Sequence, residues 1–193
     1  CFDDVLLVPQ YSAIKTRNDI DLSLDFLHAN RLTLPLISAP MDTVTGAAMA
    51  RAVGQFGGLG ILHRYNTIEE QVALAKKVNE KLGEEIEPVF FGAAIGVTGD
   101  FESRARTLYD IGWKIFCLDV AHGHHELMKS ALNTLRQIFG TSVHLMAGNV
   151  ATLEAFNDLS DWGADSIRVG VGGGSICSTR IQTGHGVPSF QRV

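Results

Sequence analysis

The stretch Ser166-Ile-Arg-Val-Gly-Val-Gly-Gly-Gly-Ser-Ile-Cys-Ser-Thr179 joins a short apolar run to a glycine-rich loop. Residues 166–169 have the composition of a buried strand, and the four glycines that follow permit positive φ and close approach of the backbone to a ligand. Exposed amides of such a loop can stabilise a thiolate, so Cys177 is a candidate nucleophile. The alternative is a glycine turn that carries a buried, inert cysteine.

The same order, a strand followed by a polar loop and a helix, recurs along the chain. Short apolar runs predict six strands, at Leu34–Ser38, Gly58–Leu62, Val89–Ile95, Lys114–Asp119, His144–Ala147 and Ser166–Val169. Helical periodicity between them predicts five helices, at Thr45–Phe56, Thr67–Leu82, Asp100–Ile111, His125–Phe139 and Thr152–Trp162. Thr67 with Glu70, and Thr152, are typical N-caps. This alternation predicts an α/β fold with parallel strands.

Two architectures fit this alternation, an open doubly wound sheet and a (β/α)8 TIM barrel. Glycine and polar signals follow almost every predicted strand, and a barrel gathers all of these loops at one site. An open sheet uses mainly the loops at its switch point. The loops therefore favour the barrel, of which about six of the eight βα units are present. Residues 1–193 are expected to form a single, incomplete barrel domain.

Composition excludes several classes of protein. The 193 residues are 46% hydrophobic and 19% charged, which is typical of a soluble globular protein, and no apolar run is long enough to span a membrane. The net charge of −5 argues against nucleic acid as a partner. Cys1, Cys117 and Cys177 are too few and too scattered for a zinc site or a disulfide framework, so we expect a cytoplasmic protein.

The glycine loop resembles the catalytic loop of the IMP dehydrogenase/GMP reductase family, since Gly-Ser-Ile-Cys-x-Thr is followed by Arg180 and Thr183-Gly-x-Gly-x-Pro188. Further segments resemble the same family in the same order: Phe2-Asp-Asp-Val-Leu-Leu-Val-Pro9, Ala39-Pro-Met-Asp-Thr-Val44, Asp119-Val-Ala-His-Gly123, Ala147-Gly-Asn-Val150 and Gly163-Ala-Asp165. The resemblance implies an NAD(P)-dependent oxidoreductase on a TIM barrel. It covers residues 2–190.

The resemblance implies a role for several residues. Cys177 would attack C2 of a purine nucleotide to form a covalent intermediate, and Thr179 would activate the water or ammonia that enters or leaves. Asp119 would hold the ribose of the cofactor, which is NADPH or NAD. Carbonyl oxygens of Gly172, Gly174 and Cys177 would bind a monovalent cation, expected to be potassium. The nucleotide, GMP, IMP or XMP, would contact four further side chains: Ser38, Met41, Asn149 and Ser175.

Family members run two opposite reactions, and this sequence has features of both. The run Ser12-Ala-Ile-Lys-Thr-Arg17, the tripeptide Asp119-Val-Ala and the absence of a CBS module between the second and third strands resemble the reductase. The motifs Ser38-Ala-Pro-Met and Gly57-Gly-Leu-Gly-Ile-Leu-His63 resemble those of the dehydrogenase. On balance the sequence favours GMP reductase, with IMP dehydrogenase as the alternative. A non-catalytic barrel that binds purine nucleotide is a second alternative.

The remaining motifs receive structural interpretations. His122, His124 and His125 lack the spacing of a metal site, so we expect solvent-facing or helix-capping roles. His185 stands where the family has a small apolar residue, and an exposed histidine is expected there. Cys117 is expected in the core, and the acidic turn at 84–87 in solvent. The resemblance also implies a homotetramer.

Overall fold

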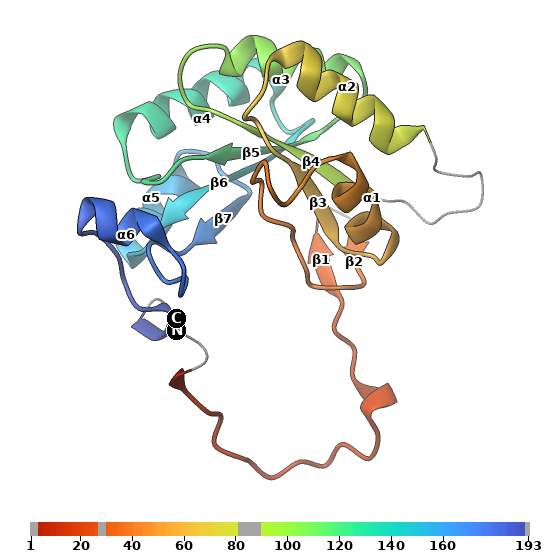
Figure 1. Ribbon diagram of the computed structural model, residues 1–193, viewed down its shortest axis with the longest axis vertical. Helices are drawn as coiled ribbons and strands as arrows, with labels where there is room; N and C mark the ends of the chain where they lie inside the picture. Colours follow the sequence, from red (N-terminus) through yellow and green to blue (C-terminus); the bar gives the residue numbers. More distant parts are fainter. Residues whose placement is uncertain (1–3, 27–29, 81–89, 192–193) are drawn as a thin grey trace.

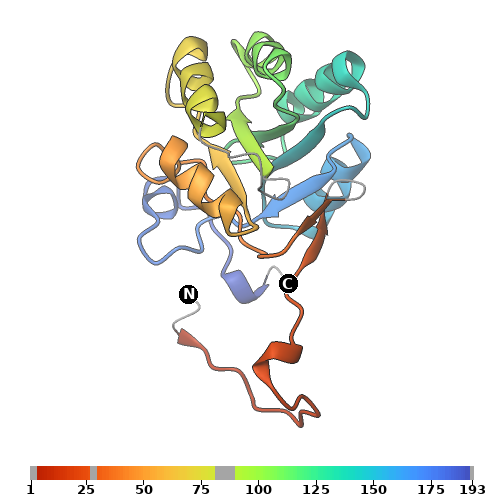
Figure 2. The ribbon, with the colours of Figure 1, turned by 90° about the vertical axis from the view of Figure 1, so that its right-hand side faces the viewer.

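A parallel sheet of five strands forms the centre of the computed structural model, which describes residues 4–26, 30–80 and 90–191 (Figures 1 and 2). Its strands lie side by side in chain order: β3 (Leu59–Leu62), β4 (Phe90–Ile95), β5 (Ile115–Asp119), β6 (His144–Val150) and β7 (Ser166–Val169). A doubly wound sheet would reverse this order at a switch point. The unbroken order confirms the predicted barrel-type α/β architecture, of which this is a part.

Helices follow the strands and cover the outer face of the sheet (Figure 1). The structure contains α1 (Ala47–Gln55), α2 (Ile68–Asn79), α3 (Phe101–Asp110), α4 (Glu126–Phe139), α5 (Leu153–Asp161) and α6 (Ser178–Thr183). The first five confirm the predicted helices, and Thr67 with Glu70 forms the predicted capping box of α2. Thr152 caps α5 as predicted. Helix α6 was not predicted. Cys1, Leu82, the acidic turn at 84–87 and Val89 lie outside the described residues.

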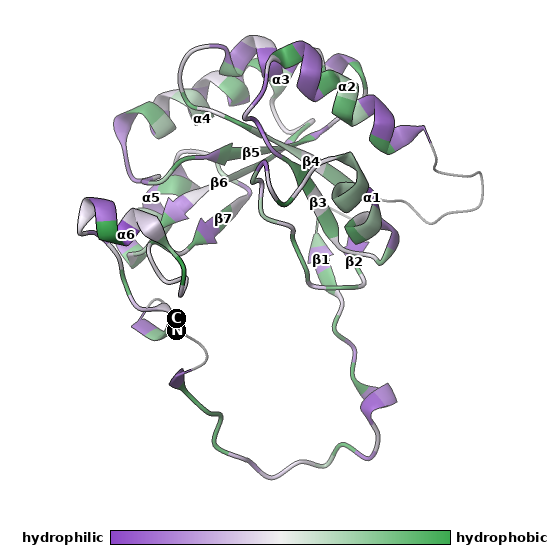
Figure 3. Ribbon diagram, viewed as in Figure 1, coloured by the Kyte–Doolittle hydropathy of each residue, from purple (hydrophilic) through white to green (hydrophobic). Residues whose placement is uncertain are grey.

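Strands β3 to β6 bury side chains on both faces, which explains why they are continuously apolar, whereas the residues of β7 are only partly buried or exposed. Phe116 and Leu118 of β5 pack with Leu145 of β6 against the helices. Ile115 and Cys117 of β5 point to the other face, where they pack with Met146. In Figure 3 apolar residues concentrate in the strands, whereas the outer helices carry the hydrophilic ones. The inner face of the sheet is the interior of the partial barrel.

A short antiparallel hairpin, which the sequence did not predict, covers one end of this interior. It consists of β1 (Leu24–Phe26) and β2 (Asn30–Leu32), and Phe26 and Leu32 are buried against the inner-face cluster. Before it, residues 4–23 extend away from the sheet and contain one short 3-10 helix, Arg17–Asp19 (Figure 1). A second 3-10 helix, Ser189–Gln191, follows α6.

The predicted strand at residues 34–38 was only partly right, because the segment makes a single parallel bridge, Ile37 to Leu59. Pro35 has no N–H to donate to a ladder. The N–H of Leu36 turns back to the carbonyl oxygen of Leu34 at 2.8 Å instead. The N–H of Ser38 donates to Leu59, so the segment still lies along β3. The structure therefore has five strands in this sheet, not six, and an extended edge beside them.

Among the described residues no helix is both long and apolar enough to cross a membrane.

Gly60 is a position where the fold requires a glycine, because β3 passes very close to α1. A Cβ atom at residue 60 would lie 2.5 Å from the Cα and the carbonyl oxygen of Ala50. We predict that Gly60→Ala destabilises the protein by about 1–3 kcal/mol or more, since the helix must move away from the sheet. Urea unfolding followed by circular dichroism measures this. Gly96→Ala is the matched control, because the nearest atom there is 3.6 Å away. Equal unfolding midpoints for the two variants would contradict the prediction.

Candidate active site

A cavity of about 340 Å³ opens where β3, β5, β6 and β7 end. Parallel strands place their carboxyl ends at one edge, so the loops that follow them meet there. The cavity contains both the predicted nucleophile and the predicted cofactor ligand. It is lined by Met41, Arg64, Tyr65, Asp119, Val120, Ala121, Asn149, Gly170, Val171, Gly172, Cys177 and Thr179.

Cys177 lies at the end of the glycine loop, immediately before α6, and its side chain is partly exposed. The main-chain N–H of Arg180 makes the largest contribution to lowering the pKa of its thiol, and the N–H and hydroxyl of Thr179 lower the pKa further. Donors directed at a sulfur favour the thiolate, which is the nucleophilic form. The cysteine predicted as the nucleophile is therefore partly exposed and activated, not buried and inert.

The loop before Cys177 depends on glycine at one position in particular. Gly172 has φ of 70°, and a Cβ atom there would lie 2.9 Å from the Cα of Gly186. The N–H of Val187 donates to the carbonyl oxygen of Val171 at 3.0 Å. The segment after α6 therefore closes against the loop, and only a residue without a side chain allows the two backbones to approach this closely.

Asp119 ends β5 and lines the cavity, but its carboxylate is already paired. Arg168 of β7 donates from Nη1 to Oδ1 of Asp119 at 2.5 Å, and the two side chains are only 26% and 18% exposed. Arg64, after β3, donates to the carbonyl oxygen of Asp119 at 3.0 Å. Sequence reasoning missed both arginines. Arg168 was concealed within an apolar strand, although a charge in a buried strand is itself a signal of a paired partner.

Asn149 and Met41 lie in the cavity, as predicted for residues that touch a nucleotide. Nδ2 of Asn149 donates to the carbonyl oxygen of Gly170 at 3.0 Å, which connects the end of β6 to the glycine loop. The peptide bond between Gly148 and Asn149 is cis. Met41 is half exposed, in the loop after residues 34–38. Residues from the loops after separate strands therefore line the same cavity.

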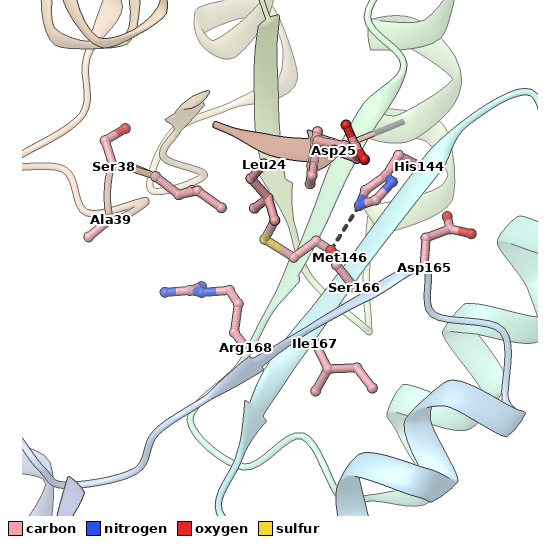
Figure 4. Close-up of a pocket in the computed structure, with 12 residues that line it drawn as sticks. Leu24, Asp25, Ser38, Ala39, His144, Met146, Asp165, Ser166, Ile167 and Arg168 are labelled. Atoms are coloured by element: carbon pink, nitrogen blue, oxygen red, sulfur yellow. Dashed lines mark hydrogen bonds between the residues drawn. The ribbon is translucent and has the colours of Figure 1, made fainter. Parts of the chain in front are cut away.

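Three other predicted site residues do not line this cavity. Ser175 and Gly174 lie on the exposed outer side of the glycine loop. Ser38 lines a second cavity, of about 460 Å³, between residues 37–39 and β7 (Figure 4). Its Oγ accepts a hydrogen bond from the N–H of Ile61 at 3.2 Å.

The second cavity faces the interior of the partial barrel. Figure 4 shows Arg168 extending from β7 toward the side formed by Ser38 and Ala39. His144, at the start of β6, has its Nε2 2.8 Å from Oγ of Ser166. Both residues lie at the amino ends of their strands, whereas Cys177 follows a carboxyl end. Because Arg168 also pairs with Asp119, this arginine lies between the two cavities.

His122, His125 and His185 are exposed, as expected, whereas His124 is partly buried against Trp162. His125 caps α4 through Nδ1, which accepts from the N–H of Leu127 at 3.1 Å. Nε2 of His124 lies 2.7 Å from Oδ2 of Asp158, and His185 is exposed. No group of three or more metal-ligating side chains occurs within residues 4–26, 30–80 and 90–191.

The glycine loop suits a monovalent cation by the chemistry of its donors. Such cations are held by neutral main-chain carbonyl oxygens. The carbonyl oxygen of Gly172 accepts from Nη1 of Arg180 at 3.3 Å, and that of Gly174 accepts from the N–H of Cys177 at 3.2 Å. Each of these oxygens retains a second lone pair. The donor chemistry of Gly172, Gly174 and Cys177 therefore fits a cation, and the guanidinium of Arg180 already bonds to the first of these oxygens.

The chain resembles proteins of known function along its whole length. The family model for the IMP dehydrogenase / GMP reductase domain matches residues 1–193. An inosine-5'-monophosphate dehydrogenase of Cryptosporidium parvum is 35% identical over 230 aligned residues, which cover all of this chain and 56% of the relative. A GMP reductase of Salmonella paratyphi B is 34% identical over 197 residues, which cover all of this chain and 55% of that protein.

A solved structure agrees with the sequence matches. The crystal structure of inosine 5' monophosphate dehydrogenase from Legionella pneumophila has a TM-score of 0.84 and 43% sequence identity, and the match covers 97% of this chain and 55% of that one. The chain thus spans little more than half the length of these relatives. Because the family model matches every residue and relatives above 30% identity align with the whole chain, the protein belongs to the IMP dehydrogenase/GMP reductase domain family.

Proposed function

We propose that this chain carries the covalent chemistry of an NAD(P)-dependent oxidoreductase that acts at C2 of a purine 5'-nucleotide. The observation that carries the proposal is Cys177, whose thiol has a lowered pKa and borders a cavity shared with Thr179, Asp119 and Asn149. A non-catalytic nucleotide binder would not need an activated thiol. Membership of a family whose relatives are dehydrogenases and reductases supports the same reaction class.

The thiolate of Cys177 adds to C2 of the nucleotide and makes a carbon–sulfur bond. In the oxidative direction the hydrogen at C2 leaves as hydride, so the nucleotide loses two electrons and a thioimidate remains on the enzyme. Water then attacks C2, loses a proton, and displaces the sulfur to give XMP. In the reductive direction the 2-amino group of GMP takes up a proton and leaves as ammonia once the sulfur is bound, hydride then arrives at C2, and the sulfur leaves as thiolate to give IMP. A nicotinamide cofactor supplies or accepts the hydride when bound. Thr179 is proposed to orient the water or ammonia at C2.

The other predicted residues complete this proposal. Asp119, fixed by Arg168, is proposed to hold the ribose of NAD or NADPH. A potassium ion is proposed at the carbonyl oxygens of Gly172, Gly174 and Cys177. Residues 1–193 are proposed to form one partial barrel domain without a CBS module, within a cytoplasmic homotetramer. The nucleotide is proposed to contact four side chains, of which the last would bind its phosphate: Ser38, Met41, Asn149 and Ser175.

Two reaction directions are candidates, and a separate observation favours each. Oxidation of IMP is the first, because the solved structure with 43% identity is a dehydrogenase. The curated relatives are split, with 35% identity to the Cryptosporidium dehydrogenase and 34% to the Salmonella GMP reductase. Reduction of GMP, which the sequence favoured, is the second. Val120 and Ala121 line the cavity after Asp119, and the sequence of this loop resembles that of the reductases. The identities change the order of the two candidates without excluding either.

The direction is testable by absorbance of the reduced nicotinamide. The protein is mixed with IMP and NAD in potassium buffer, and separately with GMP and NADPH. Growth of NADH with IMP is the expected result, and consumption of NADPH with GMP would identify the reductase. Tight binding of either nucleotide by calorimetry with no change in absorbance would contradict an oxidoreductase and favour the binding module.

Removal of the thiol tests the covalent mechanism. We predict that Cys177→Ala lowers turnover by about a thousandfold or more, because no other group can form the bond to C2. Nucleotide affinity should change little, since the thiol contributes little to ground-state binding. Steady-state kinetics and calorimetry measure the two quantities. Cys117→Ala is the control, because that thiol is fully buried. Turnover retained in Cys177→Ala would rule out the covalent step.

The two thiols should differ in their reaction with iodoacetamide. Because the pKa of Cys177 is lowered, its alkylation should rise with pH through a midpoint below that of a free cysteine measured under the same conditions. Burial raises the pKa of Cys117 to about 11, so it should stay unlabelled until the protein unfolds. Thr179→Val, which removes a hydroxyl donor, should shift the Cys177 midpoint upward. Mass spectrometry in a Cys1→Ser background follows both sites, and a Cys177 midpoint at or above that of free cysteine would refute the assignment.

A further inference from the structure

The catalytic loop contains a cation of its own, the guanidinium of Arg180. Nη1 donates to the carbonyl oxygen of Gly172 and Nη2 to that of Ser175, each at 3.3 Å. Within the described part of the chain, no carboxylate forms a salt bridge with Arg180. Its side-chain hydrogen bonds are made to main-chain oxygens of the loop. A guanidinium keeps its charge at all accessible pH values and presents donors in a fixed planar fork, which can bridge two carbonyl groups.

The backbone around Arg180 is arranged to keep this side chain in place. A Cβ atom on Gly172 would lie 3.1 Å from the Cβ of Arg180, so the loop passes directly over the base of the arginine. The carbonyl oxygen of Arg180 accepts from the N–H of Gly184 at 3.0 Å, where α6 ends. Arg180 thus contacts the loop through its side chain and the segment after α6 through its main chain. Its position is set by α6 and does not depend on the loop alone.

The guanidinium and a free monovalent cation compete for one oxygen, the carbonyl oxygen of Gly172. The carbonyl oxygen of Gly172 is both a donor in the proposed cation site and an acceptor for Arg180. Two positive charges separated by a few ångströms repel each other, and Arg180 is exposed, so its guanidinium can move into solvent. A cation that enters the loop must therefore displace the guanidinium from Gly172.

We propose that Arg180 is a positioning residue whose guanidinium acts as a built-in cation, holding the carbonyl oxygens of Gly172 and Ser175 until a free monovalent cation displaces it. Without a free cation the arginine maintains the loop. With one, the arginine is released toward solvent and the cation takes its place at the carbonyl oxygen of Gly172, together with those of Gly174 and Cys177. The inference rests on the proposed cation site, but it requires no turnover and no nucleotide.

Amide hydrogen exchange in Arg180→Met tests the holding role. The readout is protection of the N–H groups of Cys177 and Val187, which donate within the loop and across to it. In tetramethylammonium buffer the unmodified protein should stay protected, whereas exchange in the variant should be faster by about tenfold or more. Potassium should restore protection in the variant and change little in the unmodified protein. Equal protection of both proteins without potassium, or no restoration by potassium, would overturn the proposal.

Conservative replacement and direct cation binding separate positioning from general destabilisation. Arg180→Lys, which keeps one charged donor group, and added methylguanidinium with Arg180→Met should each restore part of the protection. Arg106→Met, which removes an exposed arginine on α3 paired with Glu102, should behave like the unmodified protein. Thallium(I), a spectroscopic substitute for potassium, should bind Arg180→Met more tightly than the unmodified protein. Equal or weaker binding would overturn the displacement. Activity assays are independent of these readouts, so the failure of either proposal is distinguishable from failure of the other.

Discussion

The ion pair between Asp119 and Arg168 connects the interior of this partial barrel to the candidate active site. The two residues come from β5 and β7, which are separated by β6, and their side chains meet on the inner face of the sheet. Side chains of alternate strands share a layer inside a barrel, so this contact follows from the strand order. An unpaired carboxylate in that layer would be costly, and the arginine offsets its burial. The pair also lies between the two cavities, and it fixes the Asp119 carboxylate at the edge of the one that contains Cys177.

A second network, made of buried hydrogen bonds around Gln71, positions the loop after β3, which lines the cavity of Cys177. Gln71 of α2 is fully buried and donates from Nε2 to the carbonyl oxygens of His63 and Ala94, each at 2.9 Å. Oε1 of Gln71 accepts from Arg104 of α3, which in turn pairs with Asp100. These bonds tie the ends of β3 and β4 to the helices that follow them. The loop that carries Arg64 is therefore held in place at His63, and the position of the Arg64 side chain is set by β3 and the helix that follows it.

Periodicity and local chemistry in the sequence were enough to predict much of the fold. They indicated five helices, the capping box at Thr67, the barrel-type architecture and the loop cysteine, because each depends on neighbours in the chain. Contacts between distant residues, such as Arg168 with Asp119, were missed because the local sequence of one strand does not specify its register with another strand. Nor did the sequence indicate that the side chains expected to contact a nucleotide would line two cavities, Met41 and Asn149 in one and Ser38 in the other. Pro35 breaks the ladder of the segment at residues 34–38, and the serine lies beside β7 in the second cavity.

The two described cysteines show how position in the fold decides chemistry. Cys117 is within β5, where burial raises the pKa of its thiol to about 11 even though Nη1 of Arg168 lies 3.6 Å from its sulfur. Cys177 lies beyond the end of β7, where main-chain N–H groups face its sulfur and lower its pKa. Desolvation outweighs a nearby positive charge at the first site, and the amides outweigh the small desolvation at the second. A strand interior raises the pKa of a thiol and the loop beyond a strand end lowers it, so in this fold the more easily ionised cysteine lies at the edge where the loops meet.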